Sequence, residues 1–430
     1  MYQNSTFIKL LKAEVVPALG CTEPIAVALA VAKARETLGE IPTSIKLFLS
    51  PNIFKNGMGV GIPGTGMTGL PIAAALGAIY GKSADSLELL TGVDDNDVKR
   101  AKSLVSENRV SIQVKEGTEK LYIEAVCSNT QGNWAKAIIT DKHSNISKVE
   151  LNGELIDCKT AKQVDSENDS KKESVSLTVE SIFDFIADVP FKDIEFILRT
   201  VDYNTTIANE GLSKDYGLRV GRVLKGYNDK GILADDLMNN AMYLTAAACD
   251  ARMAGCTLPV MSNSGSGNQG LTATLPVYSA AVRFKSSNEA LARALALSHL
   301  VAIHIKNHLG RLSALCGCVV AAAGAGCGVS YLMGGRLNEA IYTVKNMVGN
   351  VTGMVCDGAK EGCALKVSSG VSSAIQSALL AMQGVVISSN DGIIDDDIEK
   401  TIGNLAMVGS EGMTQTDELL LKIMVSKGAN

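Results

Sequence analysis

The sequence has few aromatic residues and no excess of positive charge. One Trp, ten Tyr and eight Phe occur among 430 residues, and the formal net charge is -5. A surface that binds nucleic acid needs clustered Lys and Arg, and single strands are bound by aromatic side chains on which the bases stack. The composition therefore argues against nucleic acid as a partner.

The first residues lack the apolar core of a secretory signal peptide. Lys9, Lys12 and Glu14 interrupt this segment, so we expect a cytoplasmic protein. Thiols are kept reduced in that compartment, where clustered cysteines bind metal or react more often than they form disulfides. Four of the ten cysteines are expected to be ordinary small core residues: Cys127, Cys158, Cys249 and Cys256.

The longest stretch without charge lies between Arg311 and Arg336. It is long enough to span a bilayer. Ala, Gly, Cys and Ser dominate it, however, and it lacks the Leu, Ile and Phe density and the Trp or Tyr belts of a membrane helix. We expect a buried helix or pair of helices here. A membrane protein that uses residues 312–335 as its span is the alternative.

The chain is longer than one hydrophobic core usually serves, so two or three domains are expected. Residues 1–40 predict helices that pack on the helical domain. In the second of these, Thr22 fits the N-cap and Pro24 the first turn, which puts Cys21 at a helix N-terminus.

The remaining sequence divides into an α+β module, a linker and a helical domain. Residues 41–158 contain short alternating runs such as SIKLFLS, LYIEAVC and AKAIIT, together with helical segments. Residues 159–176 are polar and aperiodic, as in a linker. Residues 177–430 predict helices almost throughout and are expected to form the catalytic domain. The predicted fold class is α+β.

Five cysteines fall in or beside breaks of the helical part: Cys316, Cys318, Cys327, Cys356 and Cys363. Their spacing matches neither a zinc ribbon nor a ferredoxin run. Cys316 and Cys318 point to different sides of a helix, so one of them is expected to serve packing unless the backbone breaks there. Cys327 would lie about 16 Å further along the same helix, too far to share a small cluster.

The segment from Cys356 to Cys363 contains Asp357, Gly358 and Gly362. These residues predict a turn that presents both thiolates inward. Three thiolates would leave one iron of a four-iron cluster without a protein ligand, and an open metal position is what substrate activation requires.

Cys21 is separate from this group in sequence. At a helix N-terminus the backbone dipole favours a thiolate, although the adjacent Glu23 opposes it. Cys21 is therefore a candidate base or nucleophile, and a buried structural thiol is the alternative interpretation.

Two Gly-rich stretches, residues 50–66 and 261–270, predict anion-binding loops. The first contains Asn52, which is predicted to bind the substrate. It also contains a G-x-G-x-x-G pattern, which Pro63 interrupts, so we do not expect a dinucleotide site. The polar side chains predicted to bind the substrate carboxylate in the second are Ser262, Asn263, Ser264, Ser266 and Asn268.

Three histidines, His299, His304 and His308, occupy one helical run. The last two share a helix face, as metal ligands can, but no Glu stands between them in the manner of a zinc peptidase. A structural or substrate-orienting role is expected.

Five motifs together resemble the iron–sulfur L-cysteine desulfidase family, which is related to the bacterial iron–sulfur L-serine dehydratases. They are ALGCTEP, SPNIFKNGMGVGIPG, ARMAGCTLPVMSNSGSGNQG, HLGRLSALCGCVVAAAGAGCG and VCDGAKEGCALKV. The resemblance implies a [4Fe-4S] cluster on Cys316, Cys356 and Cys363, with Cys318 as the alternative to Cys316. It also implies that Cys21 abstracts a proton.

The function implied is α,β-elimination of L-cysteine to pyruvate, ammonia and hydrogen sulfide, a step of cysteine catabolism. L-serine dehydration by the same site is the first alternative. A non-catalytic zinc or redox-sensing protein is an alternative of another class. The expected partner is a small amino-acid substrate, with no nucleic acid and no membrane, and assembly into a homo-oligomer is left open.

Overall fold

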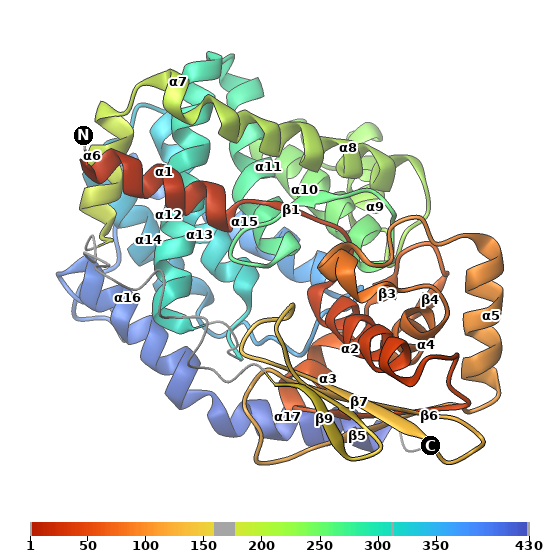
Figure 1. Cartoon of the computed structure of the whole chain (residues 1–430). Helices are drawn as coiled ribbons and strands as arrows, with labels where there is room; N and C mark the ends of the chain where they lie inside the picture. Colours follow the sequence, from red (N-terminus) through yellow and green to blue (C-terminus); the bar gives the residue numbers. More distant parts are fainter. Residues whose placement is uncertain (1, 159–176, 311–313, 428–430) are drawn as a thin grey trace.

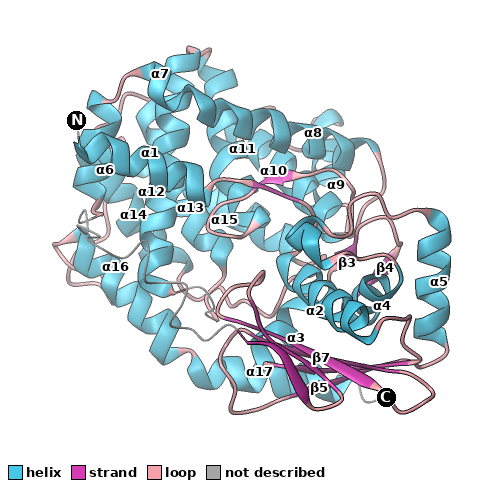
Figure 2. Ribbon diagram, viewed as in Figure 1, coloured by secondary structure: helices cyan, strands magenta, loops and turns pink. Residues whose placement is uncertain are grey.

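The computed structural model describes residues 2–158, 177–310 and 314–427. The predicted linker, residues 159–176, lies outside these ranges. The α+β prediction is confirmed: the first part of the chain combines a mixed sheet with helices, and the rest is mostly helical (Figures 1 and 2).

A six-stranded sheet forms the base of the N-terminal part. Its order is β5-β2-β6-β7-β8-β9, in which β2 and β5 are parallel and the other neighbours antiparallel. The strands are β2 (Ser44–Leu49), β5 (Val110–Val114), β6 (Tyr122–Ser128), β7 (Trp134–Thr140), β8 (Ile146–Leu151) and β9 (Glu154–Cys158). The edge strand β9 was not predicted. Every residue of β9 is exposed, so the prediction of Cys158 as a core residue was wrong.

The inner face of the sheet is covered by α2 (Thr22–Leu38), which contacts β6, β7 and β8. Buried and half-buried residues alternate along β6 and β7, because one face of each strand meets this helix and the other is partly open. The helices α4 (Leu70–Ile79) and α5 (Asp95–Ser106) complete this layer. The predicted packing of residues 1–40 on the helical domain is therefore wrong for α2, whose many alanines fit closely against the strands.

The first helix, α1 (Tyr2–Glu14), does pack on the helical part of the chain. Phe7 and Leu11 are buried, and the Phe7 ring stacks on Phe185 of α6 with centroids 4.8 Å apart. The two N-terminal helices thus belong to different layers (Figure 1). The chain between them runs through the short strand β1 (Pro17–Ala18), which pairs with β10 (Val260–Met261).

The helical part surrounds α13 (Gly317–Leu332), which contacts α11, α12, α14 and α15. Its helices are α6 (Val179–Asp188), α7 (Phe191–Ile194), α8 (Arg199–Ser213), α9 (Val220–Asp229), α10 (Leu237–Met253), α11 (Gly267–Phe284), α12 (Asn288–Leu309), α14 (Leu337–Val351), α15 (Cys363–Ala381), α16 (Ile398–Met407) and α17 (Thr414–Lys427). Residues 318–330 of α13 are all buried. No helix in the described ranges has both the length and the apolar character to cross a membrane.

The two parts meet around α3 (Pro51–Gly57) and the hairpin β3 (Gly61–Ile62) and β4 (Met67–Thr68). A Cβ on Gly61 would lie 2.3 Å from the backbone carbon of Ala254, so only glycine allows this approach to the end of α10. One buried apolar cluster runs across the junction and includes Cys21, Cys316 and Cys363. The Gly-rich stretch that predicts an anion loop therefore joins the two parts.

Candidate active site

A cavity of about 700 Å³ lies at this junction. Its lining brings together five cysteines from four separate segments of the chain: Cys21, Cys316, Cys318, Cys356 and Cys363. Cys327 is fully buried in α13, and its thiol donates to the carbonyl oxygen of Ala340 at 3.5 Å. The exclusion of Cys327 from the predicted site agrees with this placement.

Cys316 and Cys356 are held by a short antiparallel contact. Leu315 and Val355 form an isolated β-bridge. The backbone N–H of each cysteine donates to a carbonyl of the other segment, at 3.0 Å for Cys316 and 2.7 Å for Cys356. Residues placed diagonally across such a bridge share a face, with Cα atoms about 7–8 Å apart. The two thiols thus approach the cavity from one side with space between them.

The backbone does break between Cys316 and Cys318. Cys316 is the extended N-cap residue of α13, with φ -67° and ψ 123°, and Cys318 lies in the first turn. The expectation that only one of them can face the site was based on a continuous helix, and both line the cavity. They differ in acidity. The neighbouring Cys318 thiol and the backbone N–H groups of Cys318 and Val319 lower the pKa of Cys316 to about 7 against the effect of burial, whereas the contact with Cys316 and burial raise the pKa of Cys318.

The segment between Cys356 and Cys363 is a turn, as its composition predicts. Asp357 forms ion pairs with both Lys360 and Lys366, and the Lys366 ammonium also donates to Val355 O at 2.7 Å. Cys363 begins α15, and its backbone N–H donates to Lys360 O at 2.9 Å. Two lysines and one carboxylate therefore fix the conformation of the turn.

Gly358 lets this turn approach α3. It adopts φ +92°, and a Cβ there would lie 2.2 Å from the carbonyl oxygen of Lys55. A side chain at this position would push the turn away from α3, and with it Cys356.

The thiols fit a sulfur-ligated cofactor. Thiolates are the usual ligands of iron–sulfur clusters. Within the described residues, no three His, Cys, Asp or Glu side chains converge to hold one metal ion. Thiol side chains around one cavity are the donor type that such a cofactor takes.

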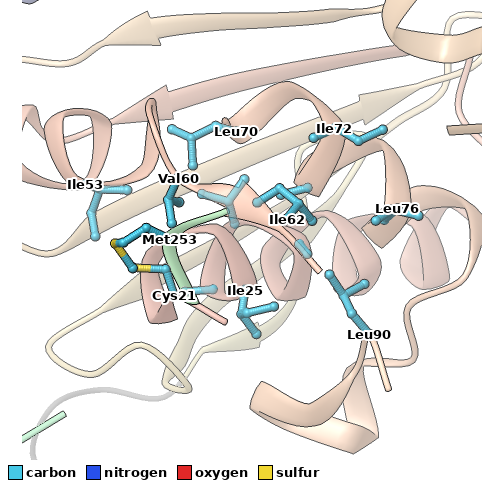
Figure 3. Close-up of a cluster of buried hydrophobic side chains, with 14 of the residues drawn as sticks. Cys21, Ile25, Ile53, Val60, Ile62, Leu70, Ile72, Leu76, Leu90 and Met253 are labelled. Carbon is cyan, nitrogen blue, oxygen red and sulfur yellow. The ribbon is translucent and has the colours of Figure 1, made fainter. Parts of the chain in front are cut away.

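Cys21 lies immediately before the first residue of α2, as its N-cap, so Thr22 is the first helical residue and not the cap. It lies at the edge of the buried cluster that also contains Ile25 and Met253 (Figure 3). Its thiol donates to Glu23 Oε2 at 3.5 Å. Burial and the Glu23 carboxylate raise the pKa of Cys21 to about 12 and outweigh the opposing charge of Arg252. This direction is opposite to the thiolate expected from the helix N-terminus.

Arg252, at the end of α10, links the two loops beside Cys21. Its guanidinium donates to Gly20 O at 2.9 Å and to Asn268 Oδ1 at 3.0 Å, and the side chain is buried. Arg252 Nε and Gln269 Oε1 are buried polar atoms that line the cavity without a hydrogen-bond partner in the described part of the chain. Such atoms mark places where a ligand or water completes the structure. Sequence reasoning missed both residues, although both lie within a motif that it singled out.

The predicted carboxylate loop splits into two sets of residues. Ser264, Ser266 and Asn268 line the cavity. Ser262 and Asn263 are buried and do not line it.

Each of these two residues bonds elsewhere. Ser262 Oγ donates to Val16 O at 2.7 Å, and Asn263 Nδ2 donates to His299 O at 3.2 Å and Nδ1 at 3.0 Å. These hydrogen bonds hold the loop in place on the side that does not line the cavity.

His299 contacts this loop, and its ring is present as one defined tautomer. Since Asn263 Nδ2 can only donate, His299 Nδ1 must accept, and Nε2 carries the hydrogen that is donated to Thr274 Oγ1 at 3.2 Å. Burial lowers the pKa of His299 to about 3, so the ring is neutral. His304 instead faces Glu399, with Nε2 and Oε2 2.6 Å apart. The structural role expected for these histidines agrees with these contacts.

Three further cations line the cavity: Lys55, Lys120 and Lys306. Lys55 forms an ion pair with Asp417 of α17, and Asn52 donates to the same carboxylate at 3.2 Å. Lys306, in the last turn of α12, is half-buried. Burial lowers the pKa of Lys306 to about 8, although the nearby Cys356 and Cys316 thiols oppose this. Lys306 was not singled out in the sequence, because a lysine near a helix C-terminus is a common surface feature.

Residues 84–422 match the model of the serine dehydratase alpha chain family. The chain is 51% identical over 423 residues to a UPF0597 protein of Oleidesulfovibrio alaskensis, which covers 98% of both chains. It is 50% identical over 427 residues to a UPF0597 protein of Bacteroides fragilis, 99% of both chains. A UPF0597 protein of Aeromonas hydrophila is 44% identical over 428 residues, 99% of this chain and 97% of its own. The chain therefore belongs to the serine dehydratase alpha chain family, a family of lyases related to serine dehydratase.

Proposed function

We propose that the protein is an iron–sulfur-dependent lyase that eliminates the β-substituent of a small L-amino acid, with L-cysteine as its substrate. The products would be pyruvate, ammonia and hydrogen sulfide. The observation that carries the proposal is the cavity in which Cys21 lies with Cys316, Cys356 and Cys363. A proton acceptor and a set of cofactor ligands are what a β-elimination requires at one site.

Cys316, Cys356 and Cys363 would hold a [4Fe-4S] cluster. When bound, the cluster would supply a Lewis-acidic iron for the leaving group. The Asp357 turn and the Leu315–Val355 bridge would fix two of these ligands before the cofactor binds. Pre-organised ligands with supporting contacts hold metal groups more tightly.

The Cys21 and Glu23 pair would move the α-proton of the substrate. Cys21 Sγ donates to one oxygen of Glu23, and Asn56 Nδ2 donates to the other at 3.2 Å. Cys21 Sγ, as the thiolate, would take the α-proton as the bond from the β-carbon to the leaving group breaks. Aminoacrylate would form, tautomerise to the imine and hydrolyse to pyruvate and ammonia.

Side chains around the cavity would orient the substrate. Asn52, Ser264, Ser266 and Asn268 line it, and we propose that they contact the substrate. Ser262 and Asn263 would act indirectly, since their hydrogen bonds are made behind the loop. Their part is to hold Ser264 and Ser266 in place.

L-serine is the second candidate substrate. The family model, that of the serine dehydratase alpha chain, favours it. Hydroxide and sulfide leaving groups need the same base and the same Lewis acid, so one site can serve both. The two functions differ in the rate ratio between L-cysteine and L-serine.

The test is anaerobic purification, reconstitution with iron and sulfide, a visible spectrum, and assays of pyruvate and sulfide with both amino acids. We expect a brown protein that forms pyruvate and sulfide from L-cysteine faster than it forms pyruvate from L-serine. Faster reaction of L-serine would make the protein a serine dehydratase. A colourless, zinc-containing protein inactive on both amino acids after reconstitution would contradict the proposal and support a non-catalytic zinc or redox sensor.

A further inference from the structure

Lys306 differs from the other cations of the cavity in that its ammonium group has no partner among the described residues. Lys55 is paired with Asp417, Arg252 bonds to Gly20 and Asn268, and Lys120 is engaged as well. For Lys306, no ion pair or hydrogen bond of the ammonium group is found with another described residue. A half-buried charge without a partner is unfavourable, and an anionic ligand would relieve this cost.

The position of Lys306 is fixed by α12 and not by a loop. The helix runs from Asn288 to Leu309, and the residues before Lys306 on this helix, from Leu295 to Ile305, are buried. Cys316 and Cys356 line the same cavity as Lys306. An anion bound to Lys306 would therefore lie in the compartment where the leaving group departs.

The loop predicted to bind the substrate carboxylate offers no charged group for it. Ser264 Oγ donates to Asn263 Oδ1 at 2.9 Å, and Asn268 Nδ2 donates to Met253 Sδ at 3.5 Å. A cationic donor adds charge attraction to the hydrogen bond that a carboxylate accepts. Lys306 is a cation of this cavity that is available for that bond.

We propose that the Lys306 ammonium group binds the carboxylate of the substrate and so selects amino acids with a free α-carboxylate over their amides. This inference rests on the proposed function, because it assumes that an amino acid enters the cavity. Lys306 is then a binding and specificity residue, and Cys21 acts on the α-carbon of an amino acid held at its carboxylate end.

The test compares L-cysteine with L-cysteinamide, which lacks the negative charge, in the reconstituted enzyme and its K306Q, K306R and K400Q variants. Lys400 is exposed on α16 and does not line the cavity, so K400Q makes the same charge change elsewhere. K306Q should raise KM for L-cysteine about 10- to 100-fold. It should leave the reaction of the amide nearly unchanged, and K306R should keep part of the preference.

A second readout does not need turnover. L-alanine has no leaving group, and its binding to each protein can be followed by calorimetry. Wild type and K400Q should bind it, and K306Q should bind it about 10- to 100-fold more weakly.

The outcomes separate the two proposals. An unchanged acid-to-amide preference and unchanged L-alanine binding in K306Q would overturn the role of Lys306 while leaving the lyase function in place. Loss of iron from K306Q, or a shifted cluster potential with the preference intact, would also overturn it, because Lys306 would then balance the charge of the cluster. A cluster-loaded wild type that binds L-alanine but transforms no amino acid would count against the lyase alone.

Discussion

The Cys21 thiol points its hydrogen at the Glu23 carboxylate, with Sγ and Oε2 3.5 Å apart. The two residues are neighbours at the start of α2, yet their relationship depends on burial, which raises the pKa of Cys21 to about 12. A thiol of such low acidity is a strong base once deprotonated, and the adjacent carboxylate favours its protonated form.

Replacing Cys21 with Ala should abolish turnover and leave the cluster intact. Loss of a general base costs about 10²- to 10⁴-fold in rate. The measurement is kcat for pyruvate formation together with iron and sulfide per chain. C256A is the matched control, because Cys256 is buried and does not line the cavity. Turnover retained in C21A would remove Cys21 from the mechanism.

The C316S variant should lose most of its iron after reconstitution, and C318S should keep it. The reason is geometric: Cys316 lies beside the Leu315–Val355 bridge, where it shares a face with Cys356. The measurement is the content of iron and acid-labile sulfide per chain in each variant. The reverse result, with iron lost from C318S alone, would make Cys318 the ligand.

The D357N variant should release iron to a chelator faster than wild type. Asp357 neutralises Lys360 and Lys366, so losing its charge frees the turn that carries Cys356. Contacts behind metal ligands are typically worth about 10- to 100-fold in affinity. D229N, which weakens the exposed Lys225–Asp229 pair on α9, is the control. Equal release rates in all three proteins would show that the turn is held by other contacts.

The G61A variant should be less stable than wild type by about 1–3 kcal/mol, because its Cβ would lie 2.3 Å from the backbone of Ala254. Urea unfolding measures the difference in the free energy of unfolding. G403A is matched to it: Gly403 in α16 has open space around it, and Ala there should stabilise by up to about 1 kcal/mol. Equal stability of G61A and wild type would mean that the junction is looser than its packing indicates.

The E399Q variant should be less stable than wild type at neutral pH by about 1 kcal/mol. Burial alone would raise the pKa of Glu399, but His304 and the Val179 N–H lower it below the ordinary value of 4.5. A carboxyl with a lowered folded-state pKa stabilises above its ordinary pKa, and this stability is lost as the pH falls through the folded value. The gap between the two proteins should thus close in acid. E289Q removes the carboxylate of the Glu289–Arg293 ion pair on α12, and its loss of stability relative to wild type should be smaller.

Periodicity and turn residues were enough to predict the fold class and most of the elements. Helix α12 occupies the segment 288–309 that its pattern predicts, and the strands β2, β6 and β7 match their alternating runs. These signals are local. Strand β9 was missed because it is an exposed edge without apolar alternation.

The sequence by itself determined which residue types could carry the chemistry, since thiols and a Gly-rich loop are visible in any linear reading. Three features were decided only by the tertiary structure: the pairing of Glu23 with a buried Cys21, the bridge beside Cys316, and the lack of a partner for the Lys306 charge among the described residues. These features depend on contacts between segments far apart in the chain or on the exclusion of water. Local spacing in the sequence encodes neither of these two causes. For Cys21, local sequence favoured a thiolate, but burial at the junction of the two parts favours the thiol.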